Sequence, residues 1–477
     1  MASAATWSML GQLALFSARF ITFFIVPHFL LPADYGVFGF SLLFVGLFQL
    51  LIEQVVPMAV VQSTRPVAQI ARITMRGALL VAAAGYAIMC GFAIPAAHML
   101  RDHRVTLLFP IMGTQLFMSA LYSTQVGMLQ RNLAFRRIFS VKVIGVIPSA
   151  TITILLAVSG HGYWALVVGW LSSGFCQMIA TWVTIRLPKR LPYDRMAARE
   201  LYGFSKWVTV DVVANWGLEY GPGFFIGTAL GAASLGTFRL ADQIIRATCA
   251  VALDPLTPVV YSTFSAIRRD GDDPLAALPR LNHIFGSISI PICGAFILAA
   301  IPLSLLMGPH WKGTAIVFLL DSVAWGINYL VQAVPQLFRA IGRPALVALI
   351  RVPLVVIQVI VLIFAARGGM AWFLTARIGV ELLMITLTGI ALVRALQLPA
   401  WNLLTNHARS FVLTVLSIGV SYLLGDSLPH AAVLPRLLLE ISTFAGLSIL
   451  IASRDPDSYA AYVASFLRSR KPDHARG

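Results

Sequence analysis

The chain has 477 residues, of which 58% are hydrophobic and only 11% are charged, and its mean hydropathy is +0.84. In soluble proteins roughly a quarter of the residues are charged, so this composition excludes a soluble globular fold and favours a membrane protein. The formal net charge of +16 is spread over short gaps between apolar segments. That distribution argues against nucleic-acid binding and is typical of the positive-inside pattern of membrane loops.

Apolar segments recur along the whole chain, and each can cross a hydrocarbon core of about 30 Å. Because hydrocarbon offers no hydrogen-bond partners, we expect each segment to be a helix. Lys and Arg concentrate between even-numbered spans and the next odd-numbered span, and in the C-terminal tail, which predicts that both termini are cytoplasmic in a bacterial inner membrane. The fourteen predicted spans are 5–27, 37–61, 77–97, 105–128, 140–158, 163–185, 204–229, 238–263, 283–306, 314–337, 345–365, 370–393, 408–425 and 433–452.

Short sequence echoes indicate that the chain is an internal duplication. Asp34-Tyr35-Gly36-Val37-Phe38 matches Ser234-Leu235-Gly236-Thr237-Phe238, Trp7 matches Trp207, and Phe135-Arg136 matches Phe338-Arg339. Each half begins on the same side of the membrane, so we predict a parallel repeat with the substrate between the halves. The expected fold is all-α and polytopic, with an N-lobe at 1–187, a cytoplasmic linker at 188–203, a C-lobe at 204–396, two further helices at 397–453 and a basic cytoplasmic tail at 454–477.

The repeated segments also carry a family resemblance. Residues Leu31-Pro32-Ala33-Asp34-Tyr35-Gly36-Val37-Phe38 resemble the first loop of the polysaccharide-exporting flippases in the multidrug/oligosaccharidyl-lipid/polysaccharide exporter superfamily. The segments 226–238, 258–265, 308–311 and 340–344 continue the resemblance in order, up to about residue 400. The resemblance implies two lobes around a cavity, alternating access, and transport of an undecaprenyl-pyrophosphate-linked oligosaccharide with no covalent chemistry.

Several charged residues fall inside the predicted spans, where each would cost about 2.5–3.5 kcal/mol if it faced lipid. They must therefore line a polar interior or pair with one another. On spans 7 and 8 they recur at helical spacing, which places them on one face of each helix. Gly221-Pro222-Gly223 interrupts span 7 beside this stripe and predicts a kink there. The charged residues are Arg19, Asp211, Glu219, Arg239, Asp242, Arg246, Arg377 and Glu381.

Two interpretations of these charges stay open. In the first, Arg19, Arg239 and Arg246, with Gln12 and Gln243, form a cationic lumen that binds a pyrophosphate group, since Arg contacts phosphate through paired donors. Asp211, Asn215, Glu219 and Asp242 would then bind a coupling Na⁺ or H⁺, with no other cofactor and no metal. In the second, the charges are structural ion pairs, Asp242 with Arg239 and Arg246, and Arg377 with Glu381.

Other functions are less well supported by the sequence. A cation-coupled multidrug antiporter would need an acidic lumen, whereas spans 1 and 8 are net basic. A membrane polymerase or ligase would need a large outward loop, whereas the outward loops are short. A scaffold without transport would not need the intramembrane charges. The string Asp270-Gly271-Asp272-Asp273 is typical of a solvated loop rather than a metal site. We expect the lipid-linked glycan and phospholipid as partners, with glycosyltransferases and a polymerase nearby and no nucleic acid.

Overall fold

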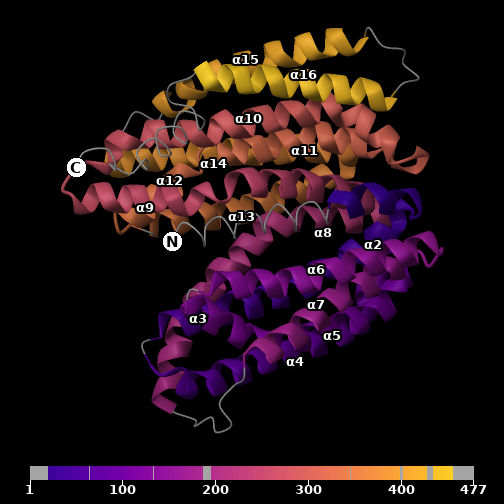
Figure 1. Ribbon diagram of the computed structural model, residues 1–477, viewed down its shortest axis with the longest axis vertical. Helices are drawn as coiled ribbons and strands as arrows, with labels where there is room; N and C mark the ends of the chain where they lie inside the picture. Colours follow the sequence, from indigo (N-terminus) through magenta and orange to yellow (C-terminus); the bar gives the residue numbers. More distant parts are fainter. Residues whose placement is uncertain are drawn as a thin grey trace, which may run out of the picture. The chain divides into compact units, whose positions relative to one another are not determined.

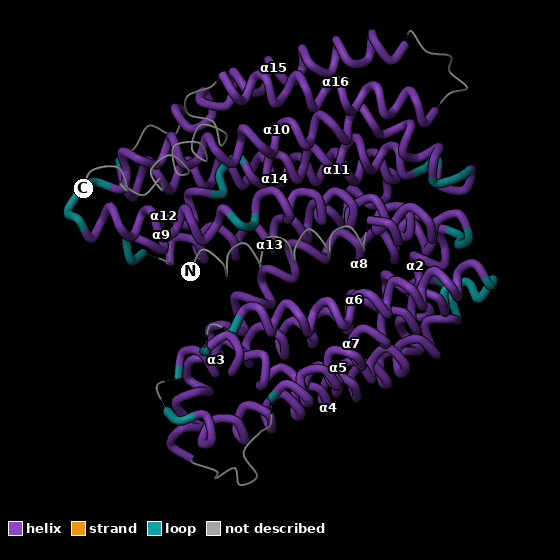
Figure 2. Tube along the Cα trace, in the orientation of Figure 1, coloured by secondary structure: helices purple, strands orange, loops and turns teal. Residues whose placement is uncertain are grey.

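The computed structural model describes residues 20–63, 65–132, 134–185, 195–343, 345–397, 401–426 and 433–454. Helices make up nearly all of this part of the chain (Figures 1 and 2), as expected of segments that must satisfy their backbone hydrogen bonds within hydrocarbon. The helices are α2 (Pro32–Leu50), α3 (Val56–Gln62), α4 (Val67–Leu100), α5 (Arg104–Arg131), α6 (Phe135–Val158), α7 (Trp164–Thr184), α8 (Arg195–Leu253), α9 (Leu256–Arg269), α10 (Pro274–Leu306), α11 (Thr314–Tyr329), α12 (Ala333–Ala340), α13 (Ala345–Ala365), α14 (Gly369–Leu396), α15 (Trp401–Asp426) and α16 (Val433–Arg454).

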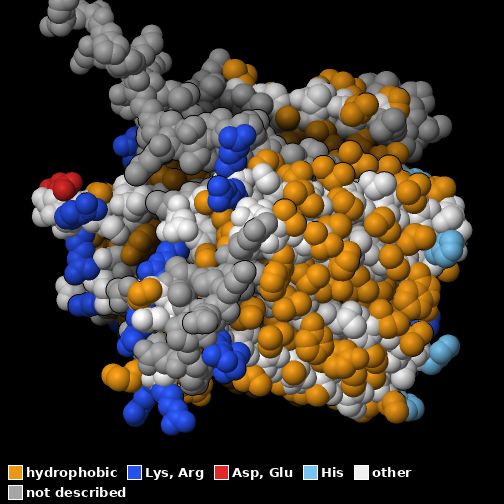
Figure 3. Space-filling view, turned by 60° about the horizontal axis from the view of Figure 1, so that its bottom comes forward, with side chains coloured by type: hydrophobic (Ala, Val, Ile, Leu, Met, Phe, Trp, Pro, Cys, Tyr) orange, Lys and Arg blue, Asp and Glu red, His pale blue; other side chains and the backbone are white. Residues whose placement is uncertain are grey.

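Ten segments in the described part are long and apolar enough to cross a membrane. Two of them, Leu201–Leu253 and Ala345–Leu396, have 53 and 52 residues. Each has two helical parts, since α8 breaks at Gly231 and the other segment consists of α13 and α14, so each is long enough to cross twice. Figure 3 shows the matching surface: apolar side chains cover the middle of this face, with Lys and Arg at one end and His at the other. The all-helical polytopic fold is confirmed, whereas the count of fourteen spans stays a prediction.

The longest helix, α8, breaks between predicted spans 7 and 8. Its non-helical residue is Gly231, with φ 86° and ψ 177°, a conformation that glycine adopts without steric cost. The backbone dihedrals stay helical through Gly221-Pro222-Gly223, so the helix is not interrupted there, and the kink at this proline stays a prediction. Predicted span 8 is divided in the structure, since α8 ends at Leu253 and α9 begins at Leu256.

The chain divides into two compact units, Met1–Leu240 and Ala241–Gly477. In the first unit, α4 packs along α5, α6 along α7, and α5 also against α7. In the second, α10 packs along α11, α13 along α14, and α11 against α14. The same order of pairing in both units is what a parallel repeat requires. Figure 1 shows α15 and α16 side by side along α10. The predicted domain boundaries themselves stay predictions.

The two copies of the repeated motif, residues 34–38 in α2 and 234–238 in α8, pack against each other within the first unit. A Cβ atom added to Gly36 would overlap the carbonyl oxygen of Ala232, and one added to Gly236 would overlap the carbonyl oxygen of Pro32. The contacts are reciprocal: each glycine approaches the residue four positions before the other glycine. Glycine at these two helical positions is thus required by backbone-to-backbone packing.

We predict that Gly36→Ala and Gly236→Ala each destabilise the protein by about 1–3 kcal/mol, because a methyl group there must push two backbones apart. The measurement is the melting temperature of the purified protein in detergent. Gly46→Ala, on the same helix as Gly36, is the matched control, since nothing lies within 4 Å of its added Cβ. Equal losses in Gly36→Ala and Gly46→Ala would contradict the prediction.

Candidate functional site

A cluster of buried charges lies in the second unit, and one charged group each from α8, α11 and α14 forms its centre. Asp242 comes from α8, Asp321 from α11 and Arg377 from α14, and their exposed fractions are 1%, 0% and 5%. Each helix is otherwise apolar enough to belong to a membrane span. Because a lone buried charge is costly in hydrocarbon, these three groups hold their helices together through mutual attraction.

The pairing around Arg377 is shared between two carboxylates. Its Nη1 atom pairs with Asp321 Oδ1 and lies 3.9 Å from Asp242 Oδ1. Asp242 also pairs with Arg246, whose Nη2 atom is 3.2 Å from Asp242 Oδ2. A single Asp thus links two guanidinium groups, one on its own helix and one on α14.

Trp325 on α11 completes this cluster. Its indole Nε1 donates to Asp242 Oδ1 at 3.1 Å. The guanidinium carbons of Arg246 and Arg377 lie 5.9 and 5.6 Å from the centre of its ring, within the range of a cation–π interaction. The indole therefore orients the carboxylate and contacts both cations.

The cluster holds more acid than base. Glu381, one turn after Arg377 on α14, accepts a hydrogen bond from Asn328 Nδ2 at 3.1 Å and adds a third carboxylate near two guanidinium groups. Asp321 Oδ2 is buried and has no hydrogen-bond partner in the described part of the chain.

Arg239 is placed differently, in the first unit and away from solvent. Its exposed fraction is 4%, and its guanidinium carbon lies 5.2 Å from the centre of the Tyr220 ring. Gly39 and Gly223 make room for it, since a Cβ on Gly223 would lie 2.7 Å from Arg239 Nη2 and one on Gly39 would lie 3.0 Å from its Cγ. The glycine of the Gly221-Pro222-Gly223 segment therefore accommodates an arginine side chain.

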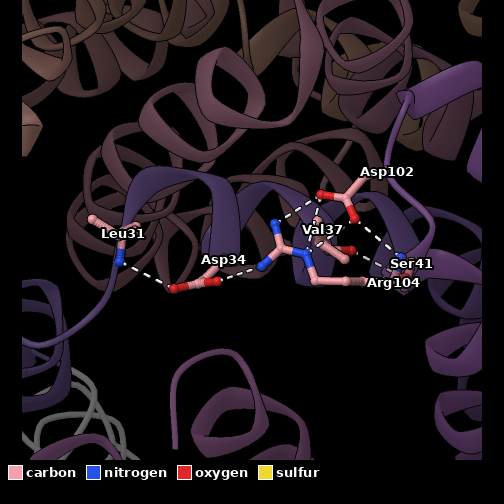
Figure 4. Close-up of polar contacts among 6 residues, drawn as sticks. All are labelled: Leu31, Asp34, Val37, Ser41, Asp102 and Arg104. Atoms are coloured by element: carbon pink, nitrogen blue, oxygen red, sulfur yellow. Dashed lines mark hydrogen bonds and ion pairs between the residues drawn. The ribbon is translucent and has the colours of Figure 1, made fainter. Parts of the chain in front are cut away.

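A third polar cluster joins helix ends in the first unit, and Figure 4 shows Arg104 between two carboxylates. Arg104 Nη1 donates to Asp34 Oδ1 at 2.6 Å, and its Nη2 donates to Asp102 Oδ2 at 2.7 Å. Asp34 Oδ2 accepts from the backbone N–H of Leu31 at 3.2 Å, which caps the start of α2. The Asp34 that belongs to the repeated motif thus anchors α2 to the loop before α5.

Comparison with known proteins connects this fold to a family. A family model described as "Polysaccharide biosynthesis protein" matches residues 25–316, more than half of the chain. The chain belongs to this family. The succinoglycan biosynthesis transport protein ExoT of Rhizobium meliloti (strain 1021) is 25% identical over 359 residues, which are 72% of this chain and 71% of ExoT.

Two solved structures share the fold of this polysaccharide biosynthesis protein. The lipid II flippase MurJ, in an inward closed conformation, matches with a TM-score of 0.73 and 11% identity, over 95% of this chain and 99% of MurJ. An inward-facing multidrug resistance MATE transporter of the MOP superfamily matches with a TM-score of 0.63 and 11% identity, over 86% and 98% of the two chains. The resemblance noted in the sequence is therefore confirmed for the family, and the chain shares its fold with these two membrane proteins.

The structure brings together only some of the residues that the sequence singled out. Asp242 and Arg246 pair as their spacing predicts. Gln243 is partly exposed, and Asn215 Nδ2 lies 3.4 Å from Glu219 Oε2. Gln12 and Arg19 lie outside the described residues, as does the side chain of Asp211. Their assignment to a substrate or coupling-ion site stays a prediction.

Sequence reasoning missed several acids within the predicted spans, among them Asp321 and Glu53. Arg377 was expected to pair with Glu381; in the structure Asp321 and Asp242 share its guanidinium group. Glu53 accepts hydrogen bonds on one oxygen from Gln49, Ser119 and Tyr122. Asp321 and Glu53 are each a single acid within an apolar segment, and that pattern alone could have identified them. Neither has a basic residue at helical spacing, which would have indicated an ion pair.

We predict that Arg377→Gln destabilises this polysaccharide biosynthesis protein by about 3–5 kcal/mol, because it leaves two carboxylates buried without their shared cation. Adding Asp321→Asn should restore most of the loss, since it removes one of those charges. The melting temperature in detergent measures both effects. Arg394→Gln, at the exposed end of the same helix, should be neutral, and a double variant no better than Arg377→Gln would contradict this account.

The Asp102–Arg104 contact predicts a dependence on pH. Burial alone would raise the pKa of Asp102, but the hydrogen bonds and the charge of Arg104 outweigh it and hold the pKa below its usual value. A lowered pKa in the folded state means that the contact stabilises the protein above the ordinary carboxylate pKa of about 4, and that this contribution is lost as the pH falls below it.

We therefore expect Asp102→Asn to lower the melting temperature near neutral pH and to flatten its decline between about pH 6 and about pH 3. Asp270→Asn is the control, because Asp270 is an exposed loop carboxylate. An unchanged pH slope in Asp102→Asn would show that the contact does not contribute.

Proposed function

We propose that this protein is a flippase that moves an undecaprenyl-pyrophosphate-linked oligosaccharide, the repeat unit of a polysaccharide, across the bacterial inner membrane by alternating access. The observation that carries the proposal is the family match over residues 25–316 together with a transporter fold. ExoT is named as a succinoglycan biosynthesis transport protein and MurJ as a lipid II flippase. Both names fit a cargo that joins a sugar to a lipid carrier.

Such transport breaks no covalent bond, so we infer that the protein is not an enzyme. The pyrophosphate group of the cargo needs a binding site in the protein, away from water. We assign that contact to Arg19, Arg239 and Arg246, with Gln12 and Gln243 beside them. Arg246 is better placed for this contact than Arg377, since 19% of its side chain is exposed against 6% for Arg377. It would exchange Asp242 for the phosphate oxygens of the cargo.

An energy source is also part of the proposal. Asp242 could accept a proton or Na⁺ when Arg246 turns to the cargo, so that the carboxylate does not stay buried and unpaired. Asp211, Asn215 and Glu219 on the first part of α8 are the other groups that we assign to such an ion. We further infer cytoplasmic termini and cooperation with glycosyltransferases and a polymerase.

A cation-coupled multidrug antiporter is the second candidate. The carboxylate surplus in the cluster of Asp242, Asp321 and Glu381 favours it, because cationic drugs seek acidic sites. The fold shared with a MATE transporter is compatible with it.

The test compares cells that lack the protein with cells complemented by wild type, Arg246→Gln or Arg436→Gln. Arg436 is a matched control, because it forms the same kind of i,i+4 pair with Glu440 on α16, at 2.8 Å. We expect polyprenyl-pyrophosphate-linked glycan to accumulate in the inner leaflet of the deletion strain, and wild type and Arg436→Gln to relieve it.

Arg246→Gln should restore at most about a tenth of the export, the effect of losing one charge-assisted contact worth about 1.5–3 kcal/mol. Full rescue by Arg246→Gln would remove this residue from the site but leave the flippase function standing. Absence of accumulation, with increased drug sensitivity in the deletion strain, would instead establish the antiporter.

A further inference from the structure

The second membrane helix of each repeat is interrupted at an acid that precedes a proline by four residues. In the first repeat these are Glu53 and Pro57, and in the second they are Asp254 and Pro258. Each pair lies in the second predicted span of its repeat, with the same acid-to-proline spacing. The pattern fits the duplication, and it was not among the echoes found from the sequence.

The chemistry of proline explains why the helices change course there. Proline has no backbone N–H, so the carbonyl four residues earlier, that of the acid itself, loses its helical hydrogen bond. In the first repeat the helix widens into a π-helical segment at Leu51–Val55 before α3 begins. In the second, α8 ends at Leu253 and α9 begins at Leu256. We call the short helices that follow, α3 and α9, the arms of the two repeats. α3 is joined to α2 through the π-helical segment, and α9 is joined to α8 through a short turn.

A tyrosine from the fourth span of the same repeat bonds each of these acids. Tyr122 on α5 donates its hydroxyl to Glu53 Oε1 at 2.5 Å, and Tyr329 on α11 donates to Asp254 Oδ1 at 3.2 Å. Glu53 Oε1 also accepts from Ser119 Oγ at 2.7 Å and Gln49 Nε2 at 2.8 Å. The donors to Glu53 are all neutral, so its contacts are hydrogen bonds that a small rotation can break and remake.

Each arm is also packed through a buried valine. Val60 on α3 is fully buried, with Ile70 and Leu201 in the same apolar cluster, and Val260 on α9 is 2% exposed. α3 packs against α5, and α9 packs against α12. Each arm is therefore held at two points, by an apolar contact near its middle and by an acid–tyrosine bond at its base.

We propose that Glu53–Tyr122 and Asp254–Tyr329 are equivalent latches, one in each repeat, that hold α3 and α9 against their own units and let these arms swing when the bond opens. The proline four residues after each acid supplies the hinge, because the helix there already lacks a backbone hydrogen bond. The latch goes beyond the proposed transport function, since it describes a motion of the protein without cargo.

The test measures the opening of each arm separately in purified protein without substrate. In a background without the four native cysteines, Val60→Cys or Val260→Cys reports opening through its rate of labelling by a water-soluble maleimide. Tyr122→Phe should raise labelling at Val60→Cys about tenfold, the factor expected from losing one hydrogen bond to a charged group, and leave Val260→Cys unchanged. Tyr329→Phe should do the reverse.

Tyr86→Phe is the matched control, because Tyr86 on α4 packs edge-on against Phe117 and bonds neither acid. If Tyr122→Phe does not fold, Glu53→Gln replaces it; this variant keeps an acceptor oxygen but loses the charge, and should raise labelling at Val60→Cys by a smaller factor. Unchanged labelling in a folded variant, or equal increases at both arms or with Tyr86→Phe, would overturn the proposal. Neither result bears on glycan export, which the cell-based experiment decides.

Discussion

A charge inside a membrane helix must find its partner within the protein, because the surrounding hydrocarbon offers none. The arrangement of the second unit follows from that constraint. Arg377, on α14, is buried, and two carboxylates from α8 and α11 converge on it. The three helices cannot separate without exposing at least one of these charges to lipid. Buried ion pairs are poor contributors to net stability, but breaking one is expensive, so this cluster specifies how the helices associate more than how tightly.

The internal duplication also determines how the helices pack. Each repeat contains the same sequence of helix pairs, and the two copies of the motif at residues 34–38 and 234–238 meet through glycine. Such close approach replaces the hydrophobic effect as the means of association, since lipid is as apolar as the side chains it surrounds. The same motif carries Asp34, which caps α2 and receives Arg104. One short motif thus serves helix initiation, helix crossing and an ion pair.

The charged residues assigned to the substrate and the coupling ion differ between the repeats. The acid–tyrosine bond and the proline hinge beside it occur in both. Within the described residues, it is the second repeat that gathers two Asp side chains and a Trp around the Arg377 guanidinium group. The first repeat contains a carboxylate, Glu53, held by neutral donors. A transporter built from two copies of one unit can in this way keep a common mechanical element and specialise one copy for charge.

The sequence by itself determined the membrane class, the all-helical fold, the duplication and the family. These follow from the length and spacing of apolar segments and from short motifs, which are properties of neighbouring residues. It also predicted the Asp242–Arg246 pair, because residues four apart share a helix face. It could not predict that Asp321 and Asp242 share Arg377, or that Tyr122 reaches Glu53, because these partners are far apart in the chain. It placed the boundary between spans 7 and 8 where α8 breaks at Gly231, but it did not predict that Gly221-Pro222-Gly223 keeps helical dihedrals. Only tertiary packing could settle which buried charge meets which.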